Sequence, residues 1–362
     1  MLSDMKTSVC PVCGKAPEAP AADNSRSTCC RCRFPYAYIG GFGSKNAQAV
    51  WNSHIQQRKS DLFTQMQQLC REQNIFTLTR TKVAYLSPAD RHLEVIADSR
   101  TPSRQNHVRQ YSSAEDSAKN EVILRTNGTL LSHGDNIFGQ NNTEAMTHIR
   151  KVVTTFDCTY AITENGDVLV SGLPVSDSVR NWHHVRELGI GNYRIAALTE
   201  QGKVLLAGNM ITPALLREVE QWPSDVVSIA SEGDALMALR ANGTVLFAGD
   251  ASDQRHRVRD WSQVTAIAIQ SLYAIGLTAD GHLLLASADN TPDSTDSEPN
   301  HPSRWEKVVA ISACRSGIGA LSSDGQVHLA GNIRRRDQLE AACRPLAAAI
   351  QEDLLRCAAE AL

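Results

Sequence analysis

The chain has 362 residues, of which 42% are hydrophobic and 21% charged, the composition of an ordinary globular protein. Its formal net charge of −3 excludes an overall basic field that would attract nucleic acid or anionic lipid. No run approaches the ~18 apolar residues of a membrane span, and the first residues lack the apolar run of a signal peptide. We therefore expect a cytoplasmic protein without membrane contact, whose ten cysteines are metal ligands or thiols.

The N-terminal segment carries two closely spaced cysteine pairs. Cys10 and Cys13 form one C-x-x-C pair, and Cys29 and Cys32 repeat it after fifteen intervening residues. Two such knuckles can hold one Zn²⁺ between four thiolates, so we predict a small zinc ribbon over residues 8–36. Because protein ligands fill every position, this zinc would be structural and would supply most of the segment's folding free energy.

Cys30 is a spare thiol inside the second pair. It could replace Cys29 only with poorer spacing, so we do not expect it to bind the metal. The segment resembles zinc-ribbon domains, a family that includes both nucleic-acid binders and protein-docking modules. The residues between the two pairs are not basic, which argues against nucleic acid.

A connecting helix is predicted over residues 44–72. Ser44 can cap its start, and its hydrophobic residues fall near one stripe. This stripe could be a docking face for a partner, but we favour packing against the rest of the chain. Its members are Ala47, Trp51, Ile55, Leu62, Phe63, Met66 and Leu69.

One pattern recurs from residue 74 to residue 333: an apolar strand, a polar turn ending in glycine, and an alternating strand that ends on a small residue. A turn of this kind between two apolar runs is a strong hairpin signal. A further strand is predicted before each hairpin, and in four copies a tryptophan opens it. The turn glycines are Gly128, Gly166, Gly202, Gly243, Gly281 and Gly325, and the tryptophans are Trp182, Trp222, Trp261 and Trp305.

A seventh copy lies at residues 83–98, where Arg91 occupies the turn position 37 residues before Gly128. Repeats of about 40 residues, each made of short strands that cannot bury both faces alone, are typical of radial blades. The chain is therefore predicted to be mainly β, a seven-bladed β-propeller with short blades. The zinc ribbon and flanking helices complete it.

The phrase GDNIFGQNN at Gly134–Asn142 resembles the signature of regulator-of-chromosome-condensation repeats. Shorter versions of it end at Asn209, Asp250 and Asn332. The resemblance covers residues 74–333, and it implies a seven-bladed propeller because members of that family form one. No residues here match the sites for nucleotide exchange or nucleosome binding of its eukaryotic members.

Two segments fall outside the repeats. Residues 289–304 form an acidic insertion, which is either a flexible loop or a contact loop for a partner. The C-terminal segment, residues 334–362, begins with a basic run at 334–336 and continues as an Ala/Leu-rich helix that Pro345 should bend or interrupt.

No catalytic motif is found: there is no P-loop, no nucleophile elbow and no H-E-x-x-H. We expect no enzyme activity, since an enzyme hypothesis has no residues to name. The aligned tryptophans could stack on a ligand, but their identical repeat position favours packing between blades. The preferred hypothesis is an interaction scaffold that binds a protein partner through loops on the propeller faces. The alternative is a nucleic-acid-associated factor that uses Arg31, Arg33 and residues 334–336.

Overall fold

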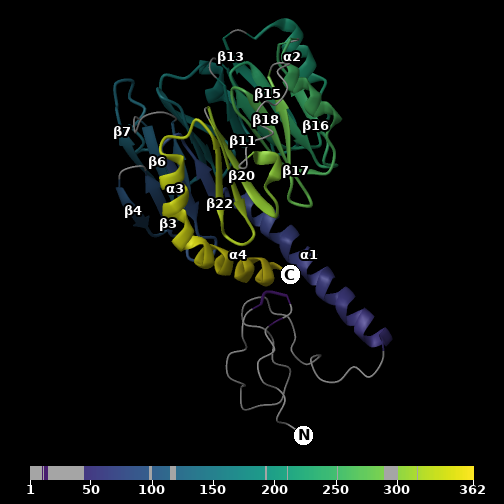
Figure 1. Ribbon diagram of the computed structural model, residues 1–362. Coiled ribbons are helices and arrows are strands. Elements are labelled where there is room, and N and C mark those ends of the chain that lie inside the picture. Colours follow the sequence, from purple (N-terminus) through teal and green to yellow (C-terminus); the bar gives the residue numbers. More distant parts are fainter. Residues whose placement is uncertain are drawn as a thin grey trace.

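The computed structural model describes residues 10, 12–14, 45–97, 100–114, 120–191, 194–209, 211–250, 252–288, 301–315 and 317–362, with the backbone alone at 45–51 and 100–103. These residues are mainly β, in one four-stranded and six three-stranded antiparallel sheets (Figure 1). The sheets follow one another along the chain. We number them blades 1 to 7.

Every strand of a blade comes from one continuous stretch of sequence. Blade 1 contains β1 (Phe76–Leu78), β2 (Lys82–Leu86), β3 (Leu93–Ala97) and β4 (Arg100–Gln105). Blades 2 and 3 contain β5 (Val108–Ser113), β6 (Asn120–Arg125) and β7 (Leu130–Gly134), then β8 (Ile149–Thr154), β9 (Cys158–Thr163) and β10 (Val168–Gly172). Blades 4 and 5 contain β11 (Val185–Ile190), β12 (Arg194–Thr199) and β13 (Val204–Gly208), then β14 (Val226–Glu232), β15 (Ala235–Arg240) and β16 (Val245–Ala248). Blades 6 and 7 contain β17 (Val264–Ile269), β18 (Tyr273–Thr278) and β19 (Leu283–Ser287), then β20 (Val308–Cys314), β21 (Gly317–Ser322) and β22 (Val327–Gly331).

The first strand of each blade is the inner one. Neighbouring inner strands lie against each other at most blade junctions, and β1 lies against β20, which closes the ring. The Leu78 N–H donates to Ser312 Oγ at 3.0 Å across this closure. In the part of the chain that the structure describes, no strand is exchanged between the first and last blades, so side chains and helices hold the ring closed.

In four blades the carbonyl of the recurring turn glycine accepts a hydrogen bond from the next blade. In blade 3, Gly166 has φ +86°, and a Cβ on it would lie 2.7 Å from His184 Cα. The Gly166 carbonyl accepts from Val185 N–H at 2.9 Å, and the His184 carbonyl accepts from Glu200 N–H at 2.8 Å. The glycine is therefore needed for a close approach between blades as well as for its left-handed backbone.

The predicted repeat copy at residues 83–98, in which arginine replaces the turn glycine, forms part of blade 1. Strands β2 and β3 pair antiparallel on either side of Arg91, as the sequence predicted. Arg91 takes the place of the glycine, with φ +55°, and its carbonyl accepts from Val108 N–H at 2.9 Å.

The hydrophobic core is divided into clusters between adjacent blades. One cluster joins Tyr160 and Ile162 of blade 3 to Ile195 of blade 4, and others join blades 4 to 5, 5 to 6 and 6 to 7. The largest lies at the closure, where blades 7, 1 and 2 meet the helices. Each blade thus buries its faces on its neighbours, which is why no single repeat could fold alone.

The repeated tryptophans differ from the sequence prediction. The repeat pattern predicts that they open a strand, but Trp182, Trp261 and Trp305 are the C-caps of the 3₁₀ helices η2 (Asp177–Asn181), η3 (Gln254–Asp260) and η4 (Pro302–Arg304). Trp222 directly follows Gln221, the C-cap of α2 (Pro213–Glu220), a helix that the sequence pattern did not reveal. In each case the backbone N–H bonds back to a carbonyl three residues earlier, and the indole packs on an inter-blade cluster. These contacts support the expected role of the four tryptophans, which is packing between blades.

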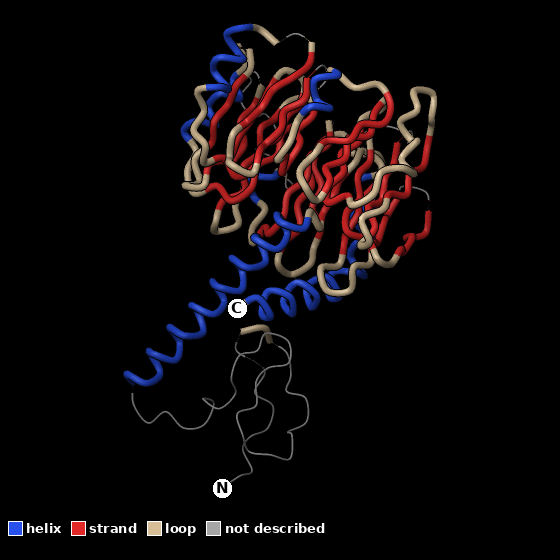
Figure 2. The backbone as a smooth tube through the Cα atoms, turned by 180° about the vertical axis from the view of Figure 1, so that it is seen from behind, coloured by secondary structure: helices blue, strands red, loops and turns tan. Residues whose placement is uncertain are grey.

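Three helices cover the closure. The predicted connecting helix is α1 (Lys45–Gln73), and the C-terminal segment forms α3 (Arg336–Cys343), the 3₁₀ helix η5 (Arg344–Leu346) and α4 (Ala347–Ala361), interrupted at Pro345. Helices α1 and α4 cross below the sheets (Figures 1 and 2). Buried Leu62 and Met66 of the predicted stripe pack into the closure cluster. The Gln67 amide also donates to the carbonyls of Thr278 and Val308, which attaches α1 to blades 6 and 7.

Candidate functional site

Two of the four predicted zinc ligands lie within the described residues. Cys10 and Cys13 stand on a tight turn in which Gly14 N–H donates to the Cys10 carbonyl at 2.8 Å and Gly14 has φ +72°. Cys29, Cys32 and the spare Cys30 lie outside the described residues. The described part of the chain contains no group of three or more potential metal ligands, so the four-thiolate site stays a prediction.

The described half of the site fits a zinc knuckle. A C-x-x-C turn followed by a glycine in the left-handed region is the backbone that lets two thiolates serve one ion. Cys10 is only 1% exposed and belongs to the closure cluster, with Val12 and Cys13 packed beside it. The turn therefore lies against the helices, just below the C-terminal end of α4 in both views (Figures 1 and 2).

Purified protein is expected to contain one equivalent of zinc, and the double substitution Cys10→Ser with Cys13→Ser should abolish it, because two remaining thiolates cannot retain a structural ion. Metal analysis after exhaustive dialysis measures this. Cys30→Ser is the matched control and should keep its zinc. A native protein without zinc, or a double variant that keeps it, would refute the ribbon.

The one full signature phrase builds a rigid loop between β7 and β8. Asn136 Oδ1 accepts from Asn141 N–H at 2.9 Å, and its amide donates to Asn142 Oδ1 at 2.8 Å. Ser171 of blade 3 donates its hydroxyl to the carbonyls of Gly139 and Asn142 at 2.7 and 3.0 Å. The loop is therefore fixed both internally and to the neighbouring blade.

Gln140 connects this loop to the next one. Its side chain is buried, its Oε1 accepts from Phe138 N–H at 2.9 Å, and its Nε2 donates to the Phe156 carbonyl at 3.3 Å. Phe156 lies in the loop between β8 and β9. The two phenyl rings meet edge to face, with centroids 6.1 Å apart. One buried amide thus brings two aromatic residues from different blades together.

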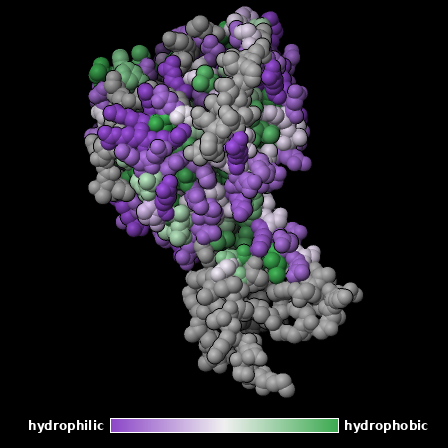
Figure 3. Space-filling model, viewed as in Figure 1, coloured by the Kyte–Doolittle hydropathy of each residue, from purple (hydrophilic) through white to green (hydrophobic). Residues whose placement is uncertain are grey.

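The result is a patch of exposed hydrophobic side chains, the aromatic patch, formed by Ile137, Phe138, Phe156 and Leu173. Ile137 is 77% exposed and Leu173 56% exposed, and Leu173 N–H donates to the carbonyl of Asp157 beside Phe156. On the side shown in Figure 3, the hydrophobic residues form only small separate patches on a hydrophilic surface. Large hydrophobic side chains held rigidly in the open are a mark of binding surfaces.

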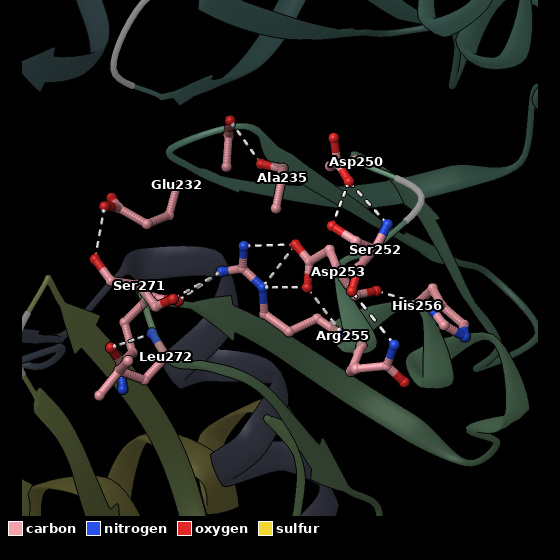
Figure 4. A network of polar contacts seen from close by, with 12 residues as sticks. Glu232, Ala235, Asp250, Ser252, Asp253, Arg255, His256, Ser271 and Leu272 are labelled. Atoms are coloured by element: carbon pink, nitrogen blue, oxygen red, sulfur yellow. Dashed lines mark hydrogen bonds and ion pairs between the residues drawn. The ribbon is translucent and has the colours of Figure 1, made fainter. Parts of the chain in front are cut away.

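The same face carries a buried ion pair where blades 5 and 6 meet (Figure 4). Arg255 of η3 and Asp253 have side chains only 9% exposed, with Nη2 and Oδ2 2.6 Å apart. Arg255 Nη1 also donates to the Gln270 carbonyl at 2.8 Å, in the loop between β17 and β18. Nearby Glu232 accepts from Ser271 Oγ, and burial raises the pKa of its carboxyl. This network stabilises the loops of the face.

The cysteines of the blades resemble packing groups rather than nucleophiles. Cys158 and Cys314 are buried, and burial raises the pKa of Cys158 to about 12, so its thiol stays protonated at neutral pH. Adjacent His183 and His184 are exposed and face different acids, Asp167 and Glu200.

No family model and no curated protein matches this chain. Among solved structures, the chain is similar to the CRINKLY WD40 ectodomain of the Arabidopsis thaliana receptor kinase ACR4. The TM-score is 0.54 and the identity 13%, over 71% of this chain and 94% of that one. The ectodomain of the Physcomitrella patens receptor kinase CR4 gives 0.48 and 13%, over 68% of each chain. Yeast RCC1 (Prp20), solved with Kap60, gives 0.39 and 12%, over 76% and 68%. The first likeness shows the fold, a β-propeller. No helix in the described residues is long and apolar enough to cross a membrane.

Proposed function

We propose that this protein is a non-catalytic interaction scaffold that binds a protein partner through the aromatic patch. The observation that carries the proposal is the exposure of Ile137 and Phe138 on a loop that the Asn136, Gln140 and Ser171 hydrogen bonds hold in place. A preorganised loop loses little conformational entropy on binding, so one of the costs that offset the burial of its hydrophobic side chains is reduced.

An exposed aromatic pair is suited to a protein partner. Two rings in edge contact present a rigid surface with an apolar rim, the kind of anchor that dominates protein interfaces. The proposed zinc ribbon would be a second docking module beside the C-terminal helices, where the turn of Cys10 and Cys13 packs on the closure cluster. Among the structural neighbours, yeast RCC1 was solved bound to Kap60.

The double substitution Ile137→Ala with Phe138→Ala is expected to weaken binding of the partner about 30-fold or more, because two anchors are removed from the centre of the surface. Alanine at exposed positions should leave the fold intact, with stability changed by no more than about 0.5 kcal/mol. The measurement is quantitative affinity capture from cell extract by the intact protein and each variant, followed by a direct titration of the captured protein.

Leu272→Ala is the matched control. Leu272 is 60% exposed in the loop between β17 and β18 of blade 6, which is equivalent to the Phe156 loop of blade 3. It should bind the partner normally. Equal binding by wild type and the double variant would refute the patch as the docking site.

Helix α1 must be kept in every truncated protein, because its Leu62, Met66 and Cys70 are buried in the closure cluster.

A further inference from the structure

A second feature lies on the opposite face, where the turn glycines are. The triplets His107-Val108-Arg109, His148-Ile149-Arg150 and His184-Val185-Arg186 begin blades 2, 3 and 4. In each triplet the histidine has a positive φ and the arginine stands on a β-bulge of the inner strand. The repeat thus places three arginines side by side, at equivalent positions of consecutive blades.

Each of these arginines also reaches the next blade. Arg150 Nη2 donates to the Val185 carbonyl at 2.7 Å, and Arg186 Nη2 to the Val227 carbonyl at 2.6 Å. A purely structural role would make such contacts necessary at every junction. Blades 5, 6 and 7 have the same bulge but carry Val227, Thr265 and Val309 there, and they join their neighbours without an arginine. Contacts between neighbouring blades therefore do not explain why these arginines occur in blades 2, 3 and 4 and not in blades 5, 6 and 7.

The three arginines line one cavity of about 550 Å³ together with the C-terminal end of α1. Arg71, Arg91 and Lys151 line it as well, so six cationic side chains face two acidic ones, Glu72 and Glu187. Ion pairs satisfy only part of this charge: Lys151 pairs with Glu187, Arg109 with Glu164 and Arg150 with Glu200.

Among the described residues, three cavity cations have no ion-pair partner: Arg71, Arg91 and Arg186. Arg186 and Arg71 donate to backbone carbonyls. The Arg150 Nε is buried without a hydrogen-bond acceptor. Burial and the neighbouring Arg109 charge lower the pKa of Arg91, so its positive charge is less stable in the ligand-free protein than on a solvated arginine. A bound anion would relieve this repulsion and accept the remaining donors.

We propose that this cavity, lined by Arg91, Arg109, Arg150 and Arg186, binds a small molecule carrying at least two phosphate groups. Its volume lies in the range of about 300–1,000 Å³ that is usual for small-molecule sites. Guanidinium groups that converge from separate blades suit phosphate oxygens, which accept several charge-assisted hydrogen bonds at once. This site is independent of the aromatic patch and concerns a different class of ligand.

The test uses inorganic pyrophosphate with the intact protein at low ionic strength, measured by calorimetric titration and by the thermal unfolding midpoint. We expect one site per chain, an affinity that falls as salt is raised, and a loss of about tenfold in affinity in Arg91→Asn. Asparagine tolerates the left-handed turn. Because the Arg91 charge is less stable in the ligand-free protein than on a solvated arginine, the ligand-free variant should unfold at the same or a higher temperature.

Arg125→Gln is the matched control. Arg125 is an exposed arginine at the blade 2 turn and does not line the cavity, so the variant should bind pyrophosphate normally. Citrate should bind more weakly than pyrophosphate. The proposal is overturned by an absence of pyrophosphate binding at low salt, by equal weakening in both variants, by equally tight citrate, or by an oligonucleotide that binds where pyrophosphate does not.

Discussion

Arg255→Met is expected to destabilise the protein by about 3–5 kcal/mol, because it removes one member of a buried ion pair and leaves the other charged. Arg255 reaches the Asp253 carboxylate with three hydrogen bonds of 2.6–3.0 Å, and both side chains are 9% exposed. The Gln270 carbonyl would lose its donor as well. Thermal and urea unfolding of the intact protein measure the loss.

The double-mutant cycle with Asp253→Asn separates this mechanism from a simple loss of packing. The double variant should lose clearly less stability than the sum of the single variants, since no uncompensated charge remains. Arg259→Met, in the same helix η3, is the matched control. Its ion pair with Glu218 is about half exposed and should contribute no more than about 1 kcal/mol. Additive losses in the cycle would contradict the prediction.

Gly325→Ala is expected to cost about 3 kcal/mol, because it combines a strained backbone with a collision. Gly325 has φ +82°, and a Cβ would lie 2.0 Å from the Ala347 carbonyl oxygen at the start of α4. The other turn glycines face a following blade, whereas this last one faces the C-terminal helix. The substitution should therefore loosen α4 and the ring closure.

Gly233→Ala isolates the backbone contribution. Gly233 has φ +57°, but nothing lies within 4 Å of its Cβ position. Its loss should be about 1 kcal/mol, the cost of the left-handed conformation alone. Hydrogen exchange should show faster opening of α4 in Gly325→Ala and not in Gly233→Ala. Equal losses of stability in the two variants would mean that the contact between Gly325 and α4 does not contribute to the effect.

Most of the propeller could be predicted from sequence because its signals are local. A hairpin requires alternating residues and a turn that accepts positive φ, and both can be recognised within about fifteen residues. The copy around Arg91 was found in this way even though an arginine replaces the glycine. The fourth strand of blade 1 and helix α2 were missed because they interrupt the repeat.

The candidate sites were only partly visible. The Gly134–Asn142 phrase indicates a family resemblance, but its sequence does not reveal that Gln140 joins Phe138 to Phe156 of the next loop. The arginine cavity was missed, although the repeated His-Val-Arg and His-Ile-Arg triplets were a signal that could have found it. The zinc ribbon stays a prediction from spacing, with one of its two turns described.

The sequence alone determined the repeat, the number of blades and the residues at each turn, because these depend on contacts between near neighbours in the chain. Only the tertiary structure decided which residues from separate repeats meet. In the folded chain, β1 lies against β20 and three helices cover this ring closure. The aromatic patch is exposed on one face, and the arginines of blades 2, 3 and 4 line one cavity on the other face. Equivalent positions in a ring become neighbours in space, and that adjacency is a property of the closed fold rather than of any single repeat.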